Sequence, residues 1–197
     1  MQLGESLRGT RPTDRRVPGE SGTWVFIVGD MTVFAFVFAT YLLARAQDPA
    51  LFAEGQQHLS ATVGATNTLL LLLSSLCVVA GVRATGRRRS RAAQRLFGLA
   101  ALCGLGFAAN KYLEYSDKIS HGLTPTTNDF WTYYYILTGL HLFHLVVGLG
   151  VLAFAIRQVG KPRLTARRYA YIEGGACFWH MVDLLWIVLF PLLYLVR

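Results

Sequence analysis

Eight ionisable side chains of this sequence lie within long apolar segments, where a charge is costly. A charged group at the centre of a membrane helix costs about 2.5–3.5 kcal/mol on insertion scales, so each one needs a partner or a role. Carboxylates and imidazoles carry protons through membrane proteins, and imidazoles also ligate haem iron and metal ions. Proton transfer, ligation and structural pairing are therefore the candidate chemistries. The eight are Asp30, Lys111, Glu114, His141, His144, Glu173, His180 and Asp183.

Helical spacing places most of these side chains on shared faces. Residues three apart are neighbours on a helix surface, and residues within about 80° of one another at 100° per residue form one stripe. We therefore expect an intramembrane polar network in which these faces meet inside a bundle. The groups that share a face are Lys111 with Glu114, His141 with His144, and Glu173 with His180 and Asp183.

Each group also has a structural interpretation. Lys111 and Glu114 are expected to form an ion pair near the outer interface, because charges in membranes usually pair. His141 and His144 could ligate a metal, but histidines in bundles more often hydrogen-bond neighbouring helices. Glu173 is expected near the inner surface, either solvated or paired with one of the arginines that precede it. No metal site and no catalytic residue is predicted.

Asp30 is harder to explain by pairing. It lies about 9 Å into the first apolar segment at the helical rise of about 1.5 Å per residue, and that segment holds no cation to pair with it. Removal from water favours the neutral form of a carboxyl group. Asp30 is therefore a candidate proton or lipid site, and we expect it to be a protonated hydrogen-bond donor at a packing interface or lipid cleft.

Five long apolar segments carry these residues. A bilayer core of roughly 30 Å needs about 20 helical residues to cross it, and nothing shows the alternation of a barrel strand. The sequence therefore predicts an all-α, polytopic membrane bundle with five transmembrane helices. The expected spans are about 24–44, 61–82, 96–115, 131–156 and 170–196, within one domain of residues 24–197.

Positive charge predicts the orientation of the bundle. Residues 1–23 are polar and Arg-rich and lack the apolar stretch of a signal peptide, so we expect a disordered, cytoplasmic basic tail. The loops after the second and fourth spans are also rich in Arg and Lys, whereas the other two loops are not. The positive-inside rule places the N-terminus in the cytoplasm and the C-terminus outside. Topology thus explains the net charge of +8, and nucleic-acid binding is not expected.

Four short motifs occur in order along the apolar segments. The first is Trp24-Val-Phe-Ile-Val-Gly-Asp30, and the second is Asn67-Thr68 with an apolar run into Ser74-Ser75. The third is Lys111-Tyr-Leu-Glu114-Tyr115, followed by Thr138-Gly139-Leu-His141-Leu-Phe-His144 and Gly148. The fourth is Trp179-His180-Met-Val-Asp183-Leu-Leu-Trp186. Together they resemble the subunit III family of haem-copper oxidases, the cytochrome c oxidase subunit 3 family.

The resemblance implies a five-helix bacterial form of a non-catalytic subunit, shorter than the seven-helix mitochondrial form. Such a subunit carries no haem or copper, which belong to partner subunits I and II. It packs against catalytic subunit I, binds phospholipid, and supports assembly and sustained turnover in aerobic electron transport at the plasma membrane. The positions that match the family motifs are Trp24, Asn67, Tyr115, Thr138, Gly139, Gly148, Trp179 and Trp186.

Three alternatives stay open. Asp30 stands where the family usually has Glu, and the Gly-Asp-Met sequence there resembles the branch associated with nitric oxide reductases. A cytochrome b-like electron carrier would use His141 or His144 together with His180 as axial ligands. A proton-coupled transporter would use Asp30, His180 and Asp183 as a relay, although no repeat or broken helix supports that function.

Overall fold

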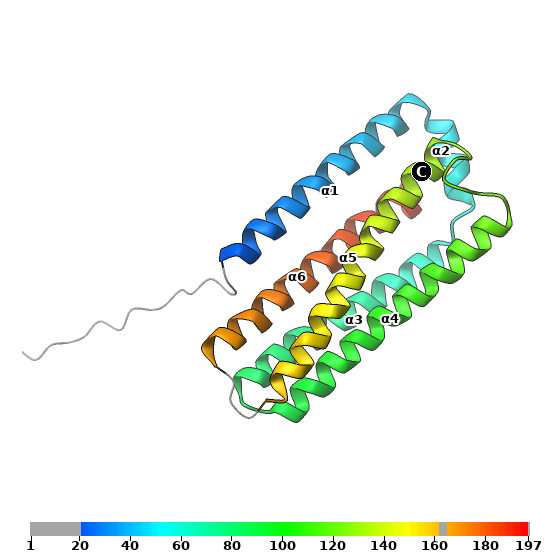
Figure 1. Ribbon diagram of the computed structural model, residues 1–197. Coiled ribbons are helices and arrows are strands. Elements are labelled where there is room, and N and C mark those ends of the chain that lie inside the picture. Colours follow the sequence, from blue (N-terminus) through cyan, green and yellow to red (C-terminus); the bar gives the residue numbers. More distant parts are fainter. Residues whose placement is uncertain (1–20, 162–164, 197) are drawn as a thin grey trace, which may run out of the picture.

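The computed structural model describes residues 21–161 and 165–196, and these residues are helical apart from short connections (Figure 1). Within these residues, five helices are long and apolar enough to cross a membrane. They are α1 (Ser21–Gln47), α3 (Ala61–Gly86), α4 (Ser90–Ser120), α5 (Asp129–Val159) and α6 (Ala166–Phe190), which continues into the π-helical turn η1 (Pro191–Leu195). The predicted all-α bundle with five membrane spans is confirmed. Residues 1–20 of the expected basic tail lie outside the described residues.

Capping residues mark where three of the membrane helices begin. The side chains of Ser60, Asn128 and Thr165 accept hydrogen bonds from backbone N–H groups in the first turns of α3, α5 and α6. Such caps satisfy donors that a helix start leaves free. Two of these helices therefore begin before their expected spans: α5 begins at Asp129 and α6 at Ala166, where the apolar pattern indicated 131 and 170. Helix α4 (Ser90–Ser120) also extends past its expected span of 96–115, although no side chain caps its start.

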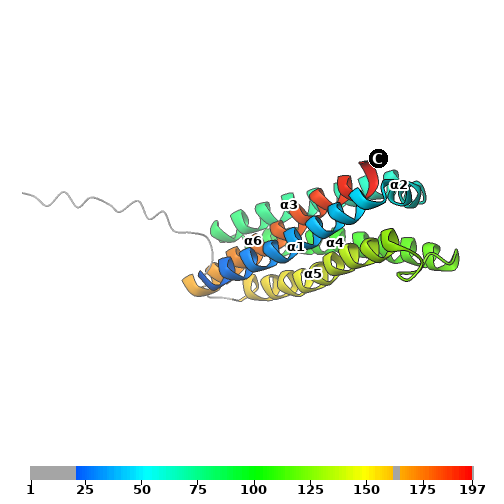
Figure 2. The same ribbon diagram turned by 90° about the horizontal axis from the view of Figure 1, so that it is seen from above.

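A short helix, α2 (Pro49–Gln57), lies in a connection for which the sequence analysis predicted no helix. Asp48 caps it through a 3.1 Å bond from the backbone N–H of Leu51, and proline stands at its first position. Phe52 is buried edge-on against Tyr41, with ring centroids 5.3 Å apart. Figure 2 shows α2 beside the C-terminal end of the chain, where it covers one end of the bundle. The Asp-Pro pair was the available sequence signal for this helix.

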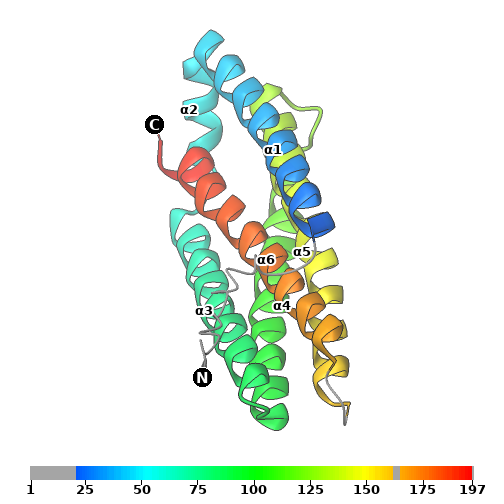
Figure 3. The same ribbon diagram turned by 90° about the vertical axis from the view of Figure 1, so that its left-hand side faces the viewer.

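Helix α6 occupies the centre of the bundle and α1 its periphery. Figure 3 shows α6 running between α3 on one side and α1 with α5 on the other. Among the five spans α6 has the largest buried share and α1 the smallest, and α1 packs chiefly on α5 and α6. Large apolar side chains on the outer faces, such as Val25, Leu69 and Leu102, are exposed. Such faces suit lipid or partner membrane helices.

Some glycines of the bundle allow close helix packing and others do not. A Cβ at Gly148 would lie 2.7 Å from the Trp179 ring, and one at Gly104 would lie 2.9 Å from the same ring. The indole of Trp179 therefore fills a slot between α4 and α5. By contrast, a Cβ at Gly139 or Gly150 would meet nothing within 4 Å. Among the described residues, close packing around the Trp179 ring therefore depends on Gly104 and Gly148 and does not involve Gly139 or Gly150.

Candidate functional site

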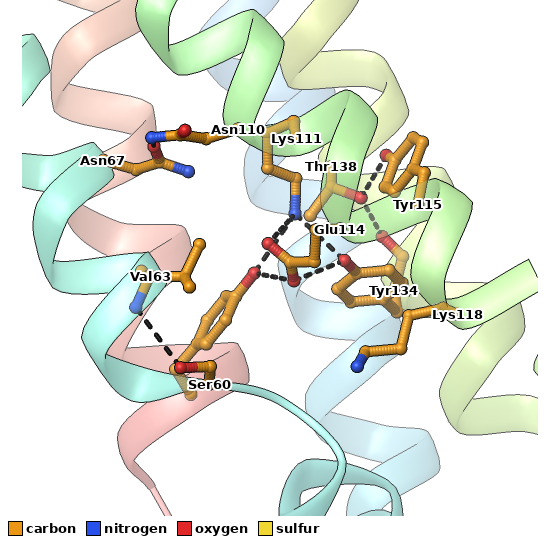
Figure 4. Close-up of polar contacts among 12 residues, drawn as sticks. Ser60, Val63, Asn67, Asn110, Lys111, Glu114, Tyr115, Lys118, Tyr134 and Thr138 are labelled. Carbon is orange, nitrogen blue, oxygen red and sulfur yellow. Dashed lines mark hydrogen bonds and ion pairs between the residues drawn. The ribbon is translucent and has the colours of Figure 1, made fainter. Parts of the chain in front are cut away.

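The buried ion pair of Lys111 and Glu114 lies near the end of the bundle that α2 covers (Figure 4). Lys111 Nζ is 3.3 Å from Glu114 Oε2, and it donates hydrogen bonds to the hydroxyls of Tyr134 at 3.0 Å and Tyr194 at 3.1 Å. Both hydroxyls in turn donate to Glu114 Oε1 at 2.7 Å. The two charged side chains are only 1% and 8% exposed. The expected pair is present, with its polar atoms enclosed by two tyrosines.

Aromatic rings complete the surroundings of Lys111. The Nζ atom lies 4.8–5.8 Å from the ring centroids of Tyr115, Tyr134, Trp186 and Tyr194, within the range of cation–π attraction. Sequence reasoning missed the part played by Tyr194, because the π-helical turn η1 decides where that ring points. The cluster joins α4, α5 and the C-terminal turn, which makes it a structural tie between distant parts of the chain.

Other residues at family-motif positions support this cluster. The hydroxyls of Tyr115 and Thr138 are 2.6 Å apart, and Thr138 also bonds to the backbone oxygen of Tyr134. Asn67 is fully buried and accepts a 2.9 Å bond from Asn110. These bonds orient the helices that carry the ion pair.

A second polar site joins α1 to α5 through Asp30 and His144. Asp30 Oδ2 lies 3.1 Å from His144 Nε2, at ion-pair distance but without hydrogen-bond alignment. His144 Nδ1 lies 2.8 Å from the backbone oxygen of Leu140 and must donate there, since that oxygen can only accept. His144 of α5 therefore supplies the partner that Asp30 lacks on its own helix, and the two side chains connect α1 to α5.

A third polar site joins α3 to α6. Ser75 Oγ and His180 Nδ1 are 2.7 Å apart. Asp183, one turn further along α6, is 3% exposed, and neither of its carboxyl oxygens has a hydrogen-bond partner among the described residues. Glu173 is partly buried and lines a cavity with Arg83 and His180. Its expected pairing with a preceding arginine stays a prediction.

Tryptophans of the fourth motif also bond across this junction. The indole N–H of Trp179 donates to Ser74 Oγ at 3.0 Å, and that of Trp186 donates to Thr68 Oγ1 at 3.1 Å. Both indoles are fully buried. The motif therefore ties α6 to α3 at two levels, which the order of residues in the sequence does not show.

The match with known proteins decides the family. Residues 19–196 match the family model described as "Cytochrome c oxidase subunit III". The chain belongs to this family. It is 33% identical over 175 residues to "Cytochrome c oxidase subunit 3" of Synechocystis sp., covering 88% of this chain and 74% of that relative. It is 30% identical over 176 residues to "Probable cytochrome c oxidase subunit 3" of Mycobacterium bovis, covering 89% and 87%.

The family match confirms the resemblance carried by the four motifs: the protein is a subunit III of a haem-copper oxidase. The family match favours neither the cytochrome b-like electron carrier nor the proton-coupled transporter. Subunit III is a non-catalytic family, and the part of the chain that the structure describes contains no group of three or more His, Cys, Asp or Glu that could hold a metal ion. The similar protein of Corynebacterium diphtheriae, 29% identical over 178 residues, is likewise named cytochrome c oxidase subunit 3.

Within this subunit III the expected polar stripes do not form one continuous network. They meet as separate sites between α4, α5 and η1, between α1 and α5, and between α3 and α6. His141 is fully buried between the rings of Phe107 and Trp186, and neither ring nitrogen has a hydrogen-bond partner among the described residues. The bond expected from His141 to a neighbouring helix is therefore not present.

Trp24, which belongs to the first motif, is partly exposed near the start of α1.

Proposed function

We propose that this subunit III supports an oxygen-reducing haem-copper oxidase by packing against its catalytic subunit I and by retaining phospholipid. The observation that carries the proposal is the use of buried polar groups as ties between helices, while the outer faces expose large apolar side chains. Electron transfer and oxygen reduction belong to haem and copper in subunits I and II. The relatives named as cytochrome c oxidase subunits support oxygen over nitric oxide as the substrate of the complex.

An apolar cavity between α1, α5 and α6 supports the phospholipid role. It has a volume of about 490 Å³ and is lined mainly by apolar groups, among them Phe26, Val151, Phe154 and Phe178. A lipid acyl chain offers the matching apolar surface. We place the phospholipid of this subunit there, with its chains against α1.

Co-purification tests the proposed partner and substrate. An affinity tag on this chain should bring down a haem-containing subunit I in a mild detergent, and the isolated complex should consume oxygen. Mass spectrometry should identify subunit I and bound phospholipid, and metal analysis should assign iron and copper to the partners. A complex that reduces nitric oxide but not oxygen would assign the chain to the branch associated with nitric oxide reductases. Recovery of this chain alone, with its own haem, would contradict the proposal.

The orientation proposed from charge can be tested separately. The connection between α3 and α4 lies at the same end of the bundle as the start of α1, and the end of α5 and the start of α6 lie there too (Figure 1). Arginines gather in the connection between α3 and α4, and the positive-inside rule places that end in the cytoplasm of a bacterial plasma membrane. A reporter that is active only after export, fused to the C-terminus, should therefore be active. Activity of a cytoplasm-only reporter at that position would reverse the topology.

Substitution of Asp30 separates a structural role from proton transfer. Asp30→Asn keeps the shape of the side chain and offers an N–H donor to His144 Nε2, so this variant should assemble and turn over almost normally. Asp30→Leu should loosen the α1–α5 contact, since it leaves a buried ring nitrogen unpaired at a cost of about 1–3 kcal/mol. Oxygen consumption and retention of this subunit should be followed between about pH 6 and 9, where histidines and perturbed carboxyls titrate. A pH-dependent loss of rate in a fully assembled Asn variant would instead assign proton transfer to Asp30.

A further inference from the structure

Asp183 is a buried ionisable group that none of the packing roles above explains. Its position, 17 residues after the first residue of α6, lies about 25 Å along that helix at about 1.5 Å per residue. Both carboxyl oxygens lack a hydrogen-bond partner among the described residues, and the residue is 3% exposed. An isolated carboxylate in apolar surroundings is strongly disfavoured, and such a group takes up a proton instead. The arrangement therefore suits a neutral carboxylic acid.

Ser75 and His180 lie beside this acid. His180 precedes Asp183 by three residues on α6, so the two side chains are neighbours on one face. The Ser75 hydroxyl is 2.7 Å from His180 Nδ1, and it lies near the Asp183 carboxyl group without meeting hydrogen-bond geometry. Rotation about one side-chain bond of Ser75 can bring its hydroxyl from one partner to the other.

A cavity reaches His180 from the end of the bundle where α3 ends and α6 begins. Its volume is about 250 Å³, and its lining includes the charged side chains of Arg83 and Glu173. Polar groups of this kind let water enter a cavity of this size. His180 therefore stands between an accessible cavity and a buried acid. The full lining is Val79, Val82, Arg83, Glu173, Ala176, Cys177 and His180.

We propose that Asp183 is a proton-binding site that exchanges its proton with the aqueous phase through Ser75, His180 and this cavity. The carboxyl O–H passes its proton to Ser75 Oγ while the proton of that hydroxyl moves to His180 Nδ1. The proton on Nε2 of the ring then leaves to water or a buffer base in the cavity. A carboxylate, a hydroxyl and a neutral imidazole of the other tautomer remain, so one proton has been released.

The route ends at Asp183. One turn further along α6, Trp186 donates its indole N–H to Thr68 and packs edge-on against Phe107 with ring centroids 4.7 Å apart. His141, on α5, lies behind these rings and bonds to no described group. The other titratable or charged groups on the cavity side are Arg83 on α3 and Glu173 and Cys177 on α6. Among the described residues no hydrogen-bond partner continues the route beyond Asp183, so this group acts as a proton store that is filled from the cavity.

Infrared spectroscopy of the full-length chain in lipid nanodiscs tests this directly, whichever oxidase subunits it binds. A protonated carboxyl group has its own carbonyl band, and the Asp183 band is the one that Asp183→Asn removes. After transfer from H2O to D2O, this band should shift quickly in the unmodified chain. In Ser75→Ala or His180→Gln the shift should be slower by about tenfold or more, because a missing relay group raises the barrier to transfer.

Cys177→Ala is the matched control, since it changes the lining of the same cavity without removing a relay group. Its exchange rate should equal that of the unmodified chain. The proposal is overturned if Asp183→Asn removes no carbonyl band, since the group would then be ionised. It is also overturned if exchange in both relay variants is as fast as in the unmodified chain. Circular dichroism of each variant verifies that the helices are intact. Whether Asp183 is protonated is decided by its carbonyl band in the unmodified chain, and this result does not depend on the Ser75 or His180 variants.

Discussion

Glu114→Ala should destabilise the folded subunit by about 3–5 kcal/mol, because it leaves the charge of Lys111 buried without its counter-ion. Lys111 is 1% exposed, and with Glu114 removed its Nζ would keep the two tyrosine hydroxyls as hydrogen-bond acceptors but no counter-ion. Those hydroxyls would also lose the carboxylate oxygen to which they now donate. The measurement is the unfolding free energy of the chain in a mild detergent, followed by circular dichroism against denaturant.

The same helix supplies a control for this result. Asp117 and Lys118 form a 2.8 Å ion pair near the end of α4, where the Asp117 side chain is 53% exposed. Asp117→Ala should therefore change the stability little, since exposed ion pairs contribute little. The double variant Lys111→Met with Glu114→Leu should recover much of the loss, because apolar residues can replace a buried ion pair. If Glu114→Ala and Asp117→Ala behaved alike, the buried cluster would not be a structural tie.

Gly148→Val should be the other strongly damaging substitution, at about 3 kcal/mol or more, because it overfills a packed slot. The first added carbon would lie 2.7 Å and 2.8 Å from two atoms of the Trp179 ring. That ring cannot move aside, since Gly104 approaches it from α4 and its indole N–H bonds to Ser74. The fraction of chain that stays folded on heating in detergent measures the effect.

Gly150→Val is the matched control for this substitution. It lies on the same helix two residues away, and an added Cβ there meets nothing within 4 Å. Valine carries the same intrinsic helix propensity at both positions, so a difference between the two variants reports packing alone. Equal stability of the two variants would mean that the Trp179 slot tolerates extra volume.

The membrane architecture could be predicted because it depends on local properties of the chain. Length and apolarity of a segment decide whether a helix can cross a bilayer, and both can be counted along a sequence. The ion pair of Lys111 and Glu114 could also be predicted, since residues three apart are neighbours on any helix. Helix α2 was missed because it is short and only weakly apolar, although Asp48 and Pro49 mark its start.

Partners on different helices could not be predicted in the same way. Asp30 has no cation on its own helix, and only the packing of α1 against α5 brings it 3.1 Å from His144. The same holds for Ser75 with His180, and for Tyr194, which η1 turns towards Glu114. Such contacts depend on the rotation and depth of two helices relative to each other. The hydrophobic pattern constrains the rotation and depth of a helix only weakly when the helix is apolar on most of its faces.

By itself, then, the sequence determined the helical membrane fold and, through its four motifs, the subunit III family. Both follow from residue types at fixed spacings along one chain. The tertiary structure decided that the polar residues form three separate sites and that Gly148, but not Gly139 or Gly150, faces a packed ring. It also left Asp183 beside Ser75 and His180 without a hydrogen-bond partner among the described residues. The physical reason is that burial and pairing are properties of helix–helix contacts, which form only when the bundle assembles.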